Sequence, residues 1–175
     1  MEKLKLVCPS KEYCNEVLGY KDEFVSNQET IHGSAGLEKS GDFLEWLENV
    51  RLNSCKETVK AGLVPSSTFI CVRESDNRMV GIIDIRHCLN DYLEKFGGHI
   101  GYSIRKSERQ QGYAKEMLRL ALNYCRDTLQ LDKVLITCDD DNIASASTML
   151  ANGAVLENKL IKEDGVVSRR YWIVL

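Results

Sequence analysis

A short apolar strand, a polar turn and a glycine-initiated helix follow one another within residues 97–118, and this unit most constrains the fold. The strand reads HIGYSI and ends near Ile104, and the turn RKSERQQ that follows is rich in charged and amide side chains. Gly112 then opens an amphipathic helix. The first turn of a helix exposes unpaired N–H groups at the positive end of its dipole. Because a glycine there lets an anion approach the backbone closely, the unit predicts a pyrophosphate site.

The spacing of residues in this turn excludes two common phosphate-binding loops. A nucleoside-triphosphate loop needs G-x-x-x-x-G-K-[ST], and a dinucleotide-binding fold needs G-x-G-x-x-G. Neither pattern occurs in the sequence. The turn instead reads Arg109-Gln110-Gln111-Gly112-Tyr113-Ala114, which fits [QR]-x-x-G-x-[GA]. Its place between a strand and an amphipathic helix makes this six-residue pattern specific.

Hydrophobic periodicity predicts strands and helices along the rest of the chain. We expect strands at 3–8, 68–72, 79–85, 99–104, 133–138, 155–161 and 169–175. We expect helices at 10–26, 42–50, 112–129 and 143–151, with Ser10 and Asp42 as N-caps of the first two. The predicted order is β-α-α-β-β-β-α-β-α-β-β. This order indicates an α+β protein with one central mixed sheet and helices packed on its faces.

Length and composition favour one globular domain, which we expect to span residues 1–175. The formal net charge of -3 argues against a general nucleic-acid binder, which usually carries a basic excess. The seven cysteines include no C-x-x-C pair, so neither a disulfide framework nor a zinc site is predicted. Unpaired thiols indicate a reducing compartment, and we expect a cytoplasmic location with no signal peptide and no membrane span.

The motif at 109–114, its strand–turn–helix context and the element order together resemble the GNAT superfamily of N-acetyltransferases. The resemblance covers nearly the whole chain. The runs IRHCLNDYL, GGHIGYSIRKSERQQGYAKEMLRLAL, TCDDDNIASAS and RRYWIVL look like a bacterial subgroup of predicted acetyltransferases. The resemblance implies a GNAT-like fold, acetyl-CoA as the co-substrate and transfer of its acetyl group to an amine.

The resemblance also assigns binding residues for acetyl-CoA. Backbone groups at the strand end would pair with the pantetheine arm like an added strand, and the N–H groups from Arg109 to Lys115 would hold the pyrophosphate. Asn142 and Ser145 match the family pattern on the pantetheine side, although Asn142 also fits a plain helix N-cap. The predicted set is Tyr102, Ser103, Ile104, Arg109, Gln110, Gln111, Gly112, Tyr113, Ala114, Lys115, Asn142 and Ser145.

The implied reaction is direct attack by a neutral primary amine on the thioester in a ternary complex. A base must first remove the proton of the ammonium form. We take His99 as the candidate base, with Asp84 and His87 as further candidates on the preceding strand. Many family members place an acidic tyrosine after the Asn/Ser helix start, but residues 148–155 contain none. The thiolate then leaves unassisted, or another tyrosine such as Tyr102 serves.

The acceptor side stays open at this point. The loop and helix at 31–50 should line it. The acidic residues in this segment, together with Glu29 just before it, form either an amine-attracting rim or an ordinary solvated helix face. These residues are Glu29, Glu38, Asp42, Glu45 and Glu48.

Three further interpretations concern the function and the partners of the chain. The missing family tyrosine keeps a non-catalytic acyl-CoA-binding sensor as the alternative function. A metal site at His87, Cys88 and His99 lacks paired-ligand spacing, so we predict no metal. The apolar terminal strand RRYWIVL either pairs across a homodimer or completes its own sheet.

Overall fold

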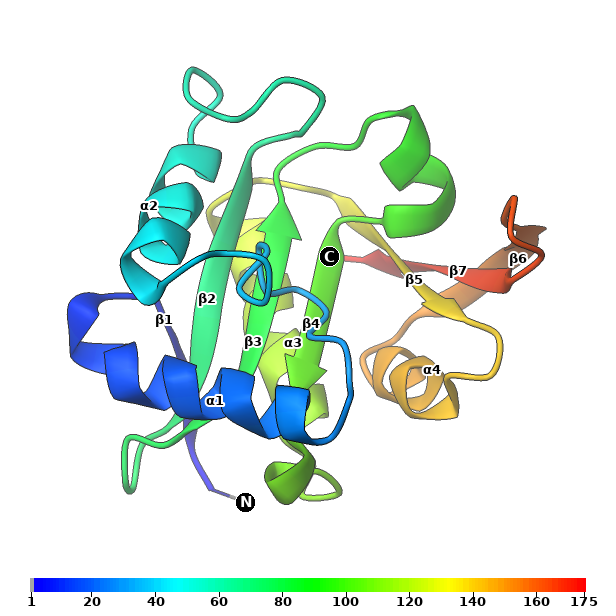
Figure 1. Ribbon diagram of the computed structural model, residues 1–175. Helices are drawn as coiled ribbons and strands as arrows, with labels where there is room; N and C mark the ends of the chain where they lie inside the picture. The colour runs from blue at the N-terminus through cyan, green and yellow to red at the C-terminus, as the bar shows by residue number, and fades with distance from the viewer. Residues whose placement is uncertain (1) are drawn as a thin grey trace.

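A computed structural model describes residues 2–175 (Figure 1). Its strands are β1 (Leu4–Val7), β2 (Ser66–Arg73), β3 (Met79–Arg86), β4 (Ile100–Ile104), β5 (Lys133–Asp139), β6 (Val155–Ile161) and β7 (Val167–Val174). Its α-helices are α1 (Cys14–Ser26), α2 (Phe43–Asn53), α3 (Tyr113–Asp127) and α4 (Ile143–Leu150). The predicted order of strands and helices is confirmed, as is the α+β class.

The described strands form two antiparallel sheets, in the orders β1-β2-β3-β4 and β5-β7-β6, where the sequence predicted one mixed sheet. The division falls between β4 and β5. A single bridge joins Gly98 to Ile136, and the N–H of His99 donates to the carbonyl of Leu135 at 2.7 Å. Beyond these contacts the two strands diverge (Figure 1), and residues of both strands line a cleft.

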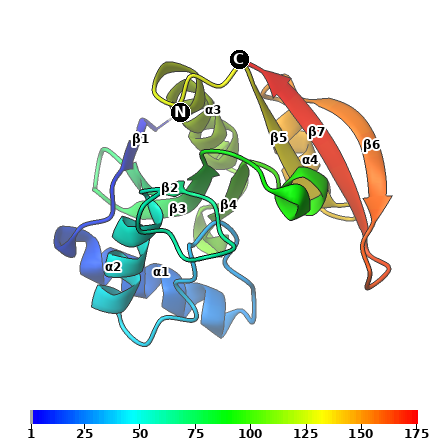
Figure 2. The ribbon, with the colours of Figure 1, turned by 90° about the horizontal axis from the view of Figure 1, so that it is seen from above.

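Helices cover both faces of the four-stranded sheet, α1 and α2 on one side and α3 on the other (Figure 2). The α1/α2 side has a core that includes Tyr20 and Trp46, both fully buried. The α3 side has a core around Met117 and Leu118, also fully buried. Each such side chain contributes on the order of 1.5–3 kcal/mol through burial. The central strands are thereby held rigidly between two cores.

The capping residues predicted from the sequence give the start of α2 correctly and the start of α1 wrongly. Asp42 caps α2 as predicted, because its Oδ1 accepts the N–H of Glu45 at 2.8 Å. Ser10 makes no side-chain cap; a 3₁₀ turn at Lys11–Tyr13 comes first, and α1 begins only at Cys14. The connection predicted before β4 contains a π-helical turn at Leu93–Gly97.

The terminal strand β7 lies between β5 and β6 and is hydrogen-bonded on both edges. It therefore completes its own sheet, and it has no free edge with which to pair across a dimer. None of the helices within residues 2–175 combines the length and the apolar character that crossing a bilayer requires.

Candidate functional site

A cleft of about 950 Å³ opens where β4 and β5 diverge. It is lined by the α1–α2 loop, by β4 with the turn and helix start that follow it, and by β5 with the start of α4. Eleven of the twelve predicted cofactor residues line it. The exception is Gln111, whose Nε2 instead donates to Glu108 Oε2 at 3.2 Å. The fold thus gathers the predicted binding residues on one cavity.

The turn before α3 offers a row of backbone donors at one end of the cleft. The row is one residue shorter than predicted, because the N–H of Arg109 donates to the Lys106 carbonyl at 3.4 Å. Within residues 2–175, the N–H groups from Gln110 to Lys115 have no hydrogen-bond acceptor. Gln110 and Gly112 both adopt left-handed φ angles, 62° and 80°. Turns of this kind let consecutive N–H groups converge on an anion, and the dipole of α3 adds to the attraction. This donor set fits the pyrophosphate of acetyl-CoA.

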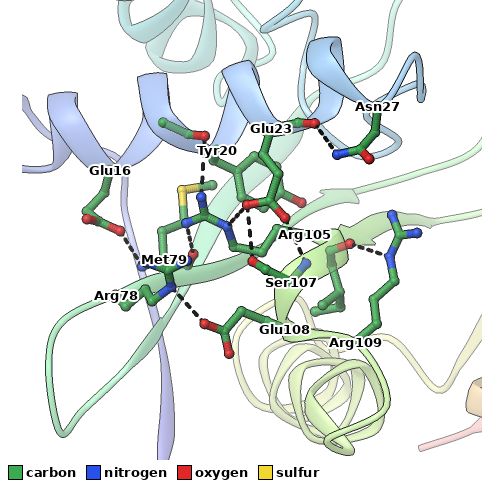
Figure 3. Close-up of polar contacts among 12 residues, drawn as sticks. Glu16, Tyr20, Glu23, Asn27, Arg78, Met79, Arg105, Ser107, Glu108 and Arg109 are labelled. Carbon is green, nitrogen blue, oxygen red and sulfur yellow. Dashed lines mark hydrogen bonds and ion pairs between the residues drawn. The ribbon is translucent and has the colours of Figure 1, made fainter.

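A buried arginine fixes the beginning of this turn (Figure 3). The Arg105 guanidinium donates to Glu23 at 2.6 Å, to the Met79 carbonyl at 3.1 Å and to the Gly19 carbonyl at 3.3 Å. Glu23 in turn accepts the N–H of Ser107 at 2.7 Å. Burial raises the pKa of Glu23, but the hydrogen bonds from Ser107 and Arg105 outweigh it and hold that pKa below its usual value. The turn is therefore tied to both α1 and β3.

A buried carboxylate, Glu108, anchors the middle of the same turn. Arg73 donates to its Oε2 at 2.8 Å. Arg78 Nε lies 2.7 Å from Oε1 (Figure 3), although its N–H is not aimed at that oxygen. Because these partners come from β2 and the β2–β3 turn, the donor row is held by tertiary contacts as well as by its own backbone.

Arg109, the first residue of the motif, joins the cofactor turn to the α1–α2 loop. Its Nε donates to the Ile104 carbonyl at 3.0 Å, and its two terminal nitrogens form a bidentate pair with Glu29. Hydrogen bonding from Arg109 lowers the pKa of Glu29. The guanidinium also lies 5.8 Å from the centre of the Phe24 ring. The two halves of the cleft are thus mechanically connected.

The open edge of β4 supplies further backbone groups to the cleft. Antiparallel pairing with β3 uses alternate residues, and the N–H of Arg105 donates to Val80 at 3.1 Å. By this alternation Ser103 bonds towards β3, whereas Tyr102 and Ile104 direct their backbone groups to the open side. An extended ligand arm can therefore pair with β4 as an added strand.

The Tyr102 side chain crosses the gap to the start of α4. Its hydroxyl lies 3.0 Å from Ser145 Oγ, and the N–H of Ser145 donates to Asn142 Oδ1 at 3.0 Å. Asn142 is thus the N-cap of α4 and also lines the cleft. Burial raises the pKa of Tyr102, so its phenol keeps its proton. Burial likewise raises the pKa of the Cys138 thiol nearby.

His99 does not line the cleft. It is buried, its Nδ1 accepts the N–H of Leu135 at 3.0 Å, and its ring packs edge-on against Trp172. Burial lowers its pKa. These contacts give His99 a packing role between β4 and β5, and they remove the geometric argument for it as the base.

The two further candidate bases are also absent from the cleft lining. Asp84 is buried and accepts from Thr68 Oγ1 at 2.8 Å, and burial raises its pKa. His87 Nε2 lies 2.8 Å from Ser67 Oγ, and burial lowers its pKa. Both side chains are thus engaged by β2 rather than directed into the cleft.

Sequence reasoning missed His32, the histidine that does line the cleft. Its carbonyl accepts Ser103 Oγ at 2.8 Å, and Gly33 beside it packs directly on Gly101 of β4. A Cβ on Gly33 would lie 2.0 Å from the Gly101 carbonyl oxygen. The signal available in the sequence was the glycine after His32, but nothing local indicates that this loop docks on a strand about seventy residues later.

The acidic residues predicted near the acceptor side do not form a rim around the cleft, and only Glu29 lines it. Each is already bonded within the protein. Glu29 pairs with Arg109, which is distant in the sequence. The other four have partners within four residues: Ser34 Oγ for Glu38, the N–H of Glu45 for Asp42, the N–H of Gly41 for Glu45, and Arg51 for Glu48. Capping and pairing on and beside α2 therefore account for these four charges.

Comparisons with known proteins agree with this geometry. A family profile described as an acetyltransferase (GNAT) domain matches residues 16–155. No curated protein sequence matches. Among solved structures, the microcin C7 self-immunity acetyltransferase MccE, in complex with acetyl-CoA and AMP, is 17% identical with a TM-score of 0.73, covering 100% of this chain and 94% of its own.

Two further structures share the fold over almost their whole lengths. The ribosomal-protein-S5-alanine acetyltransferase from Vibrio fischeri is 15% identical, with a TM-score of 0.69 and coverages of 99% of this chain and 94% of that chain. The dodecameric spermidine N-acetyltransferase from Vibrio cholerae is 15% identical, with a TM-score of 0.67 and coverages of 98% and 93%. The chain belongs to the GNAT acetyltransferase family, and it is an acetyltransferase with acetyl-CoA as its co-substrate.

Proposed function

We propose that this chain acetylates a primary amine by direct attack on the thioester of acetyl-CoA in a ternary complex. One observation carries the proposal: a single cleft is lined both by the row of free N–H groups before α3 and by His32 and Gly33 of the α1–α2 loop. Donor and acceptor can therefore be held together. The seven free cysteines favour the cytoplasmic location expected from the sequence.

The chain's own groups divide the binding work. The N–H groups from Gln110 to Lys115 hold the pyrophosphate. The backbone groups of Tyr102 and the N–H of Ile104, whose carbonyl is already bonded to Arg109, pair with the pantetheine arm. A backbone N–H on that open edge is then placed to stabilise the carbonyl oxygen as it gains negative charge. Bound acetyl-CoA supplies an activated acyl group.

Direct transfer is favoured over an acyl-enzyme route by the state of Cys138. This thiol lines the cleft, but burial raises its pKa and keeps it protonated. The thiolate is the nucleophilic form of cysteine, so a protonated thiol competes poorly with an amine.

Proton transfers are assigned to two side chains. We assign the role of base to His32 in place of His99, because a neutral imidazole nitrogen can accept a proton and His32 lines the cleft. Tyr102 donates its phenolic proton to the departing thiolate, because its hydroxyl lies on the pantetheine side and keeps its proton.

A substitution at Gly112, with a matched control, tests the binding half of the proposal. Acetyl-CoA should raise the melting temperature of the wild-type protein, and Gly112→Glu should abolish that rise by placing a bulky anion among the donors. Gly153→Glu is the control, because Gly153 has a similar φ of 83° and open space around it. Equal ligand shifts in the two variants would contradict the assignment of the cradle.

Thiol release across a panel of amines tests the catalytic half. We expect turnover with at least one amine, and a rate loss in His32→Asn of about 100-fold or more. Acetyl-CoA binding without thiol release from any amine would instead support a non-catalytic binder. Full turnover in His32→Asn would rule out His32 as the base.

A further inference from the structure

Arg86 stands out among the charged side chains that line the cleft. The cleft-lining carboxylates are already paired: Glu29 with Arg109, Glu108 with Arg73, and Asp139 with Lys162. Within residues 2–175, only two cleft-lining cations have no carboxylate partner, Lys115 and Arg86. Lys115 lies beside the pyrophosphate cradle, whereas Arg86 lies at the opposite end.

The Arg86 guanidinium is held in a fixed position. Its Nη1 donates to the carbonyls of Gly97 and Gly98 at 3.1 and 3.0 Å. Gly98 is itself immobilised, because a Cβ there would lie 2.5 Å from the Leu135 carbonyl oxygen. Two donors, Nε and Nη2, have no acceptor in the part of the chain that the structure describes. A pre-organised guanidinium loses little freedom when it binds an anion.

The free donors of Arg86 face the place where the amine must react. Nη2 lies 3.8 Å from the position of a Cβ on Gly101, the residue before Tyr102. Gly33 covers the same glycine from the α1–α2 loop. Asp84, on the same face of β3 as Arg86, makes no hydrogen bond to it and is engaged by Thr68 instead. Burial raises the pKa of Asp84, and the charge of Arg86 lowers it without a hydrogen bond between the two side chains. Nε and Nη2 of Arg86 therefore remain available to a ligand in the cleft.

On the basis of the proposed function, we propose that the acceptor is an amino acid whose carboxylate binds Arg86 while its amine attacks at β4. A guanidinium binds a carboxylate through two parallel hydrogen bonds. Because Gly101 and Tyr102 are adjacent, the amine and the anion must be close together, as the amine and carboxylate of an α-amino acid are. A polyamine would instead place positive charge beside Arg86.

An aromatic pair in the neighbouring turn indicates the kind of side chain that fits. The Tyr92 and Phe96 rings line the cleft with their centres 5.9 Å apart. Both residues precede the carbonyls that hold Arg86, so an amino acid on Arg86 can direct an apolar side chain towards the pair. Phenylalanine is therefore the first probe, and phenylalaninamide is its matched control because it has the same side chain and no carboxylate.

The test compares these two acceptors by thiol release in the wild type and in Arg86→Gln and Arg86→Lys. The wild type should prefer phenylalanine, and Arg86→Gln should raise the KM for phenylalanine about 10- to 100-fold while leaving phenylalaninamide unchanged. Arg86→Lys should keep the charge but recover only part of the preference, because it lacks the planar fork. An unchanged preference in Arg86→Gln, or equal use of acid and amide by the wild type, would overturn the proposal.

Thermal shifts distinguish loss of the Arg86 contact from misfolding and from loss of acetyl-CoA binding. The acetyl-CoA-induced rise in melting temperature should persist in both Arg86 variants, which shows that they fold, and should fall in Lys115→Gln. Phenylalanine should further stabilise the complex of the wild type with CoA, but not that of Arg86→Gln. That shift without any thiol release would sustain the Arg86 site and refute the proposed function. Stabilisation by phosphoethanolamine and not by amino acids would assign the site to a phosphate and overturn the carboxylate.

Discussion

Replacing Gly33 with alanine tests whether the α1–α2 loop is built onto β4. The new Cβ would lie 2.0 Å from the Gly101 carbonyl oxygen and 2.7 Å from the Tyr102 nitrogen. Ordinary van der Waals contact begins at 3.4 Å, so the loop must move by about 1.4 Å. It cannot move freely, because the carbonyl of Ser34 accepts Trp46 Nε1 at 2.7 Å inside the core. The substitution must therefore either strain the α1–α2 loop or detach it from β4.

The expected cost has two parts. The positive φ of 71° at Gly33 costs a non-glycine residue about 1–2 kcal/mol. Losing the hydrogen bond from Ser103 Oγ to the His32 carbonyl, together with the close packing on β4, adds about 1–2 kcal/mol. A total of about 2–4 kcal/mol corresponds to a melting temperature lower by roughly 5–15 °C in a chain of this size.

Gly36→Ala is the matched control, since Gly36 lies in the same loop with a φ of 81° and nothing within 4 Å of its Cβ position. It should lose only the backbone part, about 1–2 kcal/mol. Both variants are compared by thermal and urea unfolding and by the KM of the acceptor, which should rise only in Gly33→Ala. Equal melting temperatures and equal KM values for the two variants would refute the docking argument.

Three other outcomes follow from the buried charges and the cleft. Burial raises the pKa of Asp84, so its share of stability is lost as pH rises through that pKa. Asp84→Asn should therefore be more stable than the wild type at pH 8, with a margin that shrinks towards pH 4; a constant margin in urea unfolding would contradict this. Glu108→Gln should cost about 2 kcal/mol and weaken acetyl-CoA binding in calorimetry, because it breaks a buried pair. The exposed pair of Glu48 offers the control: Glu48→Gln should change neither quantity, and equal effects would contradict the anchoring role. Tyr102→Phe should lower kcat about 100-fold with acetyl-CoA binding retained, and an unchanged kcat would exclude it as the proton donor.

Much of the cofactor half could be predicted from the sequence because its signals are local. The cap at Asp42, the apolar stripe of α3 and the glycine that opens that helix each depend on residues within one or two turns. Backbone N–H groups before α3 depend only on where the helix begins, so most side chains in the turn can vary. The Gln111 side chain turns away from the cleft to donate to Glu108, but its backbone N–H still belongs to the free row.

The acceptor half was decided by tertiary structure. His99 lies directly before β4, within the predicted strand segment 99–104, but only the bridge between Gly98 and Ile136 brings its imidazole to Leu135 and Trp172. His32 and Arg86 come from distant parts of the chain and meet at Gly101 through loop docking and the π-helical turn. Hydrophobic periodicity and capping depend on residues close together in the sequence, so they predict helices and strands. The direction of a side chain in the cleft depends instead on tertiary contacts, which form only when the two sheets pack. The sequence by itself therefore determined the family fold and the row of free N–H groups before α3, and the packed structure decided which side chains line the rest of the cleft.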